Sequence, residues 1–104
     1  MIQEITDQNF KEQVLDAPKT FILEFTSPWC AACKKVSAFL DTFSKNAQDI
    51  LFGKIDISTN PQTSAELQVL SVPVVIIFKA GKEIKRFSGQ VNGKNLVREV
   101  EKLK

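Results

Sequence analysis

Two cysteines, Cys30 and Cys33, are the only thiols in this sequence of 104 residues, and they follow its only tryptophan, Trp29. Two alanines separate them. In thiol–disulfide exchange a thiolate attacks a sulfur atom, and a second thiol close by resolves the mixed disulfide that forms. Two thiols three residues apart can supply both groups, so the spacing predicts a redox-active pair.

The pair lies where a segment rich in β-forming residues, residues 20–25, gives way to apolar residues at helical spacing. At a helix start, unpaired backbone N–H groups and the positive end of the helix dipole favour the thiolate form of a cysteine. Cys30 faces these groups, whereas Cys33 lies one turn deeper on the same helix face. We therefore expect Cys30 to be the attacking thiol and Cys33 the resolving thiol.

Metal binding is a competing interpretation of this pair. A closed zinc site needs four ligands, usually Cys or His, and the sequence has no histidine and no third cysteine. Two chains could still share a metal or cluster across a dimer, or the two cysteines could be buried as small hydrophobes. The tryptophan and the helix start favour redox chemistry, so we expect no metal and no cofactor besides the redox-active disulfide.

Glu24 is an acid inside the apolar strand, six residues before the first cysteine. If the strand alternates, Glu24 shares with Ile22 a face that helices cover. Burial there would raise the pKa of Glu24 towards neutrality and make it a proton acceptor or donor for the deeper thiol. Equally, a sheet edge or a lysine such as Lys54 could solvate the carboxylate, and the strand pattern leaves both interpretations open.

The surrounding pattern predicts the order β-α-β-α-β-α-β-β-α. Strands are expected at residues 2–5, 20–25, 51–57, 74–78 and 83–87. Helices are expected after a cap at Thr6 or Asp7 and then over residues 30–47, 62–70 and 96–103. The fourth strand is apolar on both faces, and the turn at residues 80–82 sends the chain back antiparallel to it. An α/β fold with a central mixed sheet follows.

Length and composition bound the function. A chain of 104 residues has room for one domain, so we expect residues 1–104 to form a single unit. A net charge of +2 gives no sign of a nucleic-acid partner. The longest apolar run, residues 72–78, is too short to cross a bilayer, and the first residues do not resemble a signal peptide. We expect a monomer in the cytoplasm without membrane contact.

Over its whole length the sequence resembles the bacterial-type thioredoxin family. The motifs that carry the resemblance are Trp-Cys-x-x-Cys-Lys at residues 29–34, Asp-x-x-x-Asn-Pro at residues 56–61, Val72-Pro73, Phe-Lys-x-Gly at residues 78–81, and Gly89. The resemblance implies the thioredoxin fold, a mixed five-stranded sheet flanked by four helices. It also implies a cis peptide bond before Pro73, although the X-Pro pattern alone does not predict one.

The resemblance further implies the function and its residues. A thioredoxin reduces disulfides of client proteins and is re-reduced by a thioredoxin-reductase-like donor. The position of the family's buried acid, usually Asp, is Glu24 here, and Lys54 matches the lysine that pairs with it. The implied docking surface for an extended client peptide consists of Trp29, Ala31, Ala32, Val72, Pro73, Gly89 and Gln90.

Ala31 and Ala32 depart from the family's usual Gly-Pro between the cysteines. An alanine at position 32 restores a backbone N–H that proline lacks, and this donor can stabilise the Cys30 thiolate. The departure predicts a more oxidising pair. It keeps open a disulfide oxidase or isomerase and a reductase for one dedicated client. An alternative of a different class is a binding subunit that uses the docking surface without redox chemistry.

Overall fold

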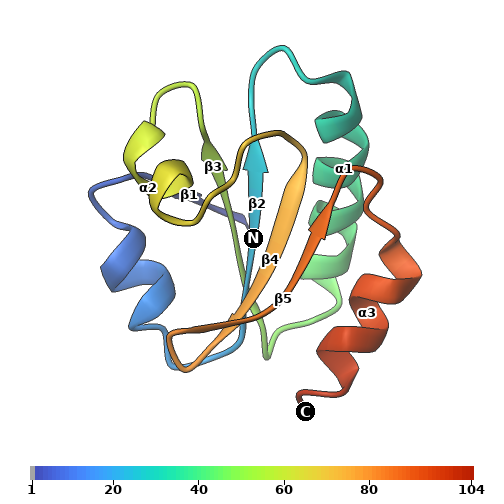
Figure 1. Ribbon diagram of the computed structural model, residues 1–104. Helices are drawn as coiled ribbons and strands as arrows, with labels where there is room; N and C mark the ends of the chain where they lie inside the picture. Colours follow the sequence, from blue (N-terminus) through green and yellow to red (C-terminus); the bar gives the residue numbers. More distant parts are fainter. Residues whose placement is uncertain (1) are drawn as a thin grey trace.

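The structure is a computed structural model that describes residues 2–104 (Figure 1). Its elements follow the expected order. They are β1 (Ile2–Ile5), η1 (Lys11–Leu15), β2 (Phe21–Thr26), α1 (Ala31–Lys45), β3 (Leu51–Asp56), α2 (Pro61–Glu66), β4 (Val74–Lys79), β5 (Lys82–Ser88) and α3 (Gly93–Glu101).

The strands form one mixed sheet in the order β1-β3-β2-β4-β5. β1, β3 and β2 run parallel, whereas β4 is antiparallel to β2 and β5 is antiparallel to β4. α1 and α3 cover one face of the sheet, and η1 and α2 cover the other (Figure 1). The predicted fold is confirmed, with β2 at the centre.

Alternation along β2 divides its side chains between two apolar clusters. Phe21, Leu23 and Phe25 point to the face covered by η1 and α2. Ile22 points to the other face, against α1 and α3. Strand geometry places Glu24 on the same face as Ile22. An acid therefore lies in the middle of the sheet, under the helix that begins at the cysteine pair.

Two of the predicted helices differ from expectation. The first is a short π-helix, because the N–H of Asp16 donates to the carbonyl of Lys11, five residues back, at 2.9 Å. α2 ends at Glu66 and does not reach residue 70. Gln68 adopts a left-handed φ of 57°, which does not continue a helix.

Neither Thr6 nor Asp7, the two expected caps, caps the first helix, because the N-cap of η1 is Phe10 and it has no side-chain cap hydrogen bond. The Thr6 hydroxyl accepts a hydrogen bond from the N–H of Asn9 at 3.2 Å, in the turn that precedes η1. The Asp7 carboxylate instead accepts from the N–H groups of Gln62 and Thr63, at 3.2 and 2.8 Å, at the start of α2. Desolvation raises the pKa of Asp7, but the hydrogen bonds from Thr63 and Gln62 together outweigh it, so the pKa is lowered.

Candidate active site

The cysteine pair lies at the junction between β2 and α1, as the sequence predicts. Cys30 is the N-cap of α1, and its sulfur accepts a hydrogen bond from the N–H of Cys33 at 3.1 Å. The two cysteines form a disulfide, so the structure is that of the oxidised state. Cys30 is half-buried, whereas the side chain of Cys33 is 2% exposed. Only one of the two sulfurs is open to an incoming thiol or disulfide.

Five of the seven expected docking residues line one groove. Trp29 is 84% exposed. A groove of about 530 Å³ brings together Ala31, Ala32, Pro73, Gly89 and Gln90. The Val72–Pro73 peptide bond is cis, as the resemblance implies. Trp29 and Val72 do not line this groove.

One exposed apolar residue, close to Val72 along the chain, was not predicted. Leu70 is 92% exposed and lies two residues before Val72, in the loop between α2 and β4. A leucine in a loop gives no periodic pattern, so only its place beside the Val72-Pro73 motif could have marked it.

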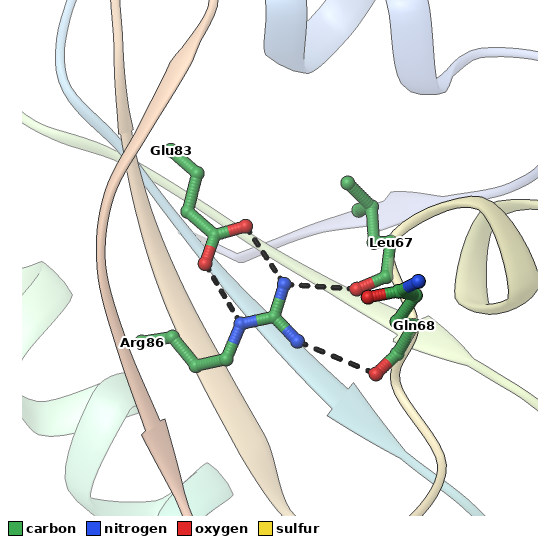
Figure 2. A network of polar contacts seen from close by, with 4 residues as sticks. All are labelled: Leu67, Gln68, Glu83 and Arg86. Atoms are coloured by element: carbon green, nitrogen blue, oxygen red, sulfur yellow. Dashed lines mark hydrogen bonds and ion pairs between the residues drawn. The ribbon is translucent and has the colours of Figure 1, made fainter.

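The loop that contains Leu70 is tied to β5 by a polar network around Arg86 (Figure 2). The guanidinium donates to both carboxylate oxygens of Glu83 at 2.7 Å, and to the carbonyls of Leu67 and Gln68 at 2.9 and 3.4 Å. The hydrogen bond from Arg86 lowers the pKa of Glu83. The network satisfies carbonyls at the end of α2 and fixes the start of the segment that leads to the cis peptide bond.

Glu24 is fully buried, so its carboxylate is not solvated at a sheet edge. Burial raises the pKa of its carboxyl, and the hydrogen bond from Ser37 and the charge of Lys54 partly oppose that rise. The Ser37 hydroxyl lies 2.8 Å from Oε1 and 2.9 Å from Oε2. Ser37 was not predicted; the signal for it was its position four residues after Cys33, on the same helix face.

Lys54 lies beside Glu24 in the sheet but does not form a close ion pair with it. The two are register partners on β3 and β2, and the lysine is exposed. The ion pairs among residues 2–104 do not include Glu24. Lys54 therefore acts on the carboxyl at longer range, through its charge.

A second cavity, of about 670 Å³, is lined by both cysteines, whereas the groove of about 530 Å³ is lined by neither. Cys30, Cys33, Ser37 and Lys54 contribute to its lining. A space of this size with several polar groups can hold water. The cysteine pair thus borders a polar space that also contains the Ser37 and Lys54 side chains.

Comparison with known proteins identifies the family. The family model named Thioredoxin matches residues 1–102. The chain belongs to the thioredoxin family. The thioredoxin of Mycobacterium tuberculosis is 36% identical over 97 residues, which cover 92% of this chain and 84% of that protein. The thioredoxin of Buchnera aphidicola is 34% identical over 92 residues, 88% of this chain and 85% of that protein.

A third relative, of Mycobacterium leprae, is a bifunctional thioredoxin reductase/thioredoxin. It is 34% identical over 98 residues, which cover 93% of this chain and 21% of that protein. As a thioredoxin-family member with its cysteine pair in place, the chain is a thiol–disulfide oxidoreductase that reduces protein disulfides.

Residues 2–104 carry neither a metal-binding cluster nor a membrane span. No group of three or more His, Cys, Asp or Glu side chains in this part of the thioredoxin domain is placed to hold a metal ion. No helix there is long and apolar enough to span a membrane.

Proposed function

We propose that Cys30 attacks disulfides of client proteins and that Cys33 resolves the mixed disulfide. The observation that carries this assignment is the difference in exposure: Cys30 is a half-buried N-cap, and Cys33 is 2% exposed. A helix N-terminus stabilises the thiolate that must attack. The buried thiol can react only with the sulfur beside it.

The exchange transfers two electrons from the pair to the client. The Cys30 thiolate attacks one sulfur of the client disulfide; a Cys30–client bond forms, the client S–S bond breaks, and the first client thiolate leaves. Cys33 then gives up its proton and attacks the sulfur of Cys30. The Cys30–Cys33 bond forms, and the second client sulfur leaves as a thiolate.

The same proposal assigns the remaining residues and partners. Glu24 accepts the proton of Cys33, and Lys54 supports the charged carboxylate from a distance. The docking surface for the client consists of Trp29, Ala31, Ala32, Val72, Pro73, Gly89 and Gln90. A thioredoxin-reductase-like donor re-reduces the pair, which the two functions named for the Mycobacterium leprae relative support. The chain works as a monomer in the cytoplasm, with no cofactor besides its own disulfide.

The test replaces each cysteine separately and follows the reduction of insulin disulfides. Cys30→Ser removes the attacking thiol, so turnover should fall to the background of the buffer. Cys33→Ser leaves attack intact but removes resolution, so it should accumulate a covalent adduct with the client that mass spectrometry detects. Full insulin reduction by Cys30→Ser would overturn the assignment, and so would an adduct that forms on Cys33 in that variant.

A further inference from the structure

We propose that Ser37 is a positioning residue, which holds the carboxyl of Glu24 for proton transfer from Cys33 in the resolving step. The inference rests on the function proposed above, because it assigns a further residue to the same reaction. Nothing in the chemistry of a cysteine pair requires a hydroxyl at this position, so the role proposed for Ser37 is argued from its geometry.

The first observation is that Ser37 holds the carboxyl from the helix side. Its hydroxyl oxygen lies 2.8 and 2.9 Å from the two carboxylate oxygens of Glu24. Within residues 2–104 no other side chain or backbone group donates a hydrogen bond to this carboxyl, and no side-chain oxygen or nitrogen there is buried without a partner. The orientation of a fully buried acid in the sheet is thus set by one hydroxyl.

The second observation is that Ser37 lines the same cavity as the buried cysteine. Cys33 and Ser37 are four residues apart on α1, so they lie on one helix face, one turn apart. Both line the cavity of about 670 Å³, whereas Glu24 does not. The hydroxyl therefore lies where the carboxyl meets the polar space beside the resolving thiol.

The charged groups nearby do not replace the hydroxyl. Lys54 and Asp56 on β3, Glu4 on β1 and Lys34 on α1 line the cavity, and β4 pairs Glu24 with the apolar Val75. None of the four charged side chains forms a hydrogen bond with Glu24 in the described chain. A lysine can only donate, but a serine hydroxyl donates to a carboxylate and accepts from a carboxylic acid. It fits Glu24 both before and after the proton arrives.

In the step itself Ser37 keeps all its covalent bonds. The S–H proton of Cys33 moves to Glu24, and the Cys33 sulfur attacks the sulfur of Cys30. The Cys30–Cys33 bond forms while the bond from Cys30 to the client breaks, and the client sulfur leaves with the electron pair. The proton on Glu24 then passes to solvent. Loss of the Ser37 hydroxyl removes the group that aims the carboxyl and favours its charged form.

The direct test is a titration of the Glu24 carboxyl carbon by NMR in the oxidised protein, where the cysteines do not titrate. Ser37→Ala removes a hydrogen bond to a charged group, so the midpoint should rise by about one pH unit. Ser37→Thr keeps the hydroxyl and should titrate like the wild type. An unchanged midpoint in Ser37→Ala would overturn the proposal. This readout needs no client, so its outcome is independent of whether the chain reduces insulin.

The kinetic test measures decay of the mixed disulfide in single turnovers between pH 5 and 9. At a pH below the titration midpoint of Glu24, Ser37→Ala should slow decay of the mixed disulfide about tenfold, because a rise of one pH unit in that midpoint lowers the charged fraction of Glu24 tenfold. The rate of the initial attack by Cys30 should not change. The control is the same substitution in a Glu24→Gln background, where it should have no such effect. An equal effect of Ser37→Ala in both backgrounds would show that the serine acts through the fold and not through Glu24, which overturns the proposal.

Discussion

The two sulfurs of the pair lie between two regions of opposite character. Next to Cys30 in the chain, Trp29 is 84% exposed, and Leu70, in the loop that leads to Val72 and Pro73, is 92% exposed. On the Cys33 side the protein places a fully buried acid and the hydroxyl that holds it. The exposed side can distinguish clients by contact area, whereas the buried side is unable to touch a client and can only change the rate and the pH dependence of exchange.

The exposed apolar side chains and the buried carboxyl affect the stability of the fold differently. Exposed apolar side chains cost the fold little, since scattered ones are normal on protein surfaces. A buried carboxyl costs more, because desolvation penalises its charged form. If the buried side is built for proton transfer, the protein must be less stable when Glu24 is charged than when it is protonated.

The largest expected effect is therefore a loss of stability with rising pH that depends on Glu24. Burial raises the pKa of Glu24 above the ordinary carboxyl value of 4.5. Between the two values the folded chain binds more protons than the unfolded chain, so the free energy of unfolding falls as pH rises, by up to about 1.4 kcal/mol per pH unit. Glu24→Gln lacks this titration, and urea unfolding from pH 4 to 9 should show its advantage over the wild type growing with pH.

Asp7 and Glu83 provide the control for this measurement, because their pKa values are lowered in the folded chain. Their contribution to stability is present above the unfolded pKa and is lost as pH falls through the folded value, the opposite sign. Both groups are common to the wild type and Glu24→Gln, so they cancel in the difference. A difference that stays constant across the range would mean that Glu24 is not held at a raised pKa.

The second effect concerns Ala31 and Ala32, which lie on the exposed side but act on a sulfur. Replacing both by Gly-Pro removes the N–H of residue 32, one of the N–H groups in the first turn of α1 that lack a partner within the helix and favour a thiolate at its N-cap. The reduced form loses stability, so the reduction potential should fall by about 30 mV, a tenfold change in the equilibrium constant. Equilibration with glutathione buffers measures it.

The matched control for the potential is Ala31→Gly alone, which keeps the N–H at residue 32 and should leave the potential near the wild-type value. Neither variant removes the N–H of Cys33, which donates to the sulfur of Cys30 at 3.1 Å. A reduction potential that rises in the Gly-Pro variant, or that falls equally in Ala31→Gly, would show that the N–H of residue 32 does not set the potential.

Local patterns were sufficient to predict most of the fold and the chemistry of the pair. The alternation of β2 correctly placed Glu24 on the face under α1, and helical spacing placed the cysteines at a helix start. Contacts between distant segments could not be predicted in this way. Asp7 caps a helix 56 residues away, and Ser37 reaches Glu24 from another element. Such contacts depend on how elements pack, which periodicity within one element does not encode.

The same limit explains why α2 is shorter than predicted. The sequence from Gln62 to Leu70 carries no glycine or proline that would end a helix. The helix nevertheless ends at Glu66, and Arg86 on β5 binds the carbonyls of Leu67 and Gln68 beyond it. A side chain from the neighbouring hairpin thus satisfies the helix end, and this early end leaves Leu70 in the loop, exposed.

The smallest expected effect tests whether that exposed leucine belongs to the client surface. Leu70→Ser removes apolar area that a client would bury, worth about 1 kcal/mol, so KM for insulin should rise about fivefold while kcat stays unchanged. The matched control is Ile84→Ser on β5, another exposed apolar residue, 44% exposed and outside the residues assigned to docking. Equal KM values for the two serine variants would exclude Leu70 from the docking surface. A fall in kcat for Leu70→Ser would instead mean that the loop influences the reaction of the sulfurs. The exposed residues would then affect the rate as well as the choice of client, and the distinction between them and the buried Glu24 and Ser37 would no longer hold.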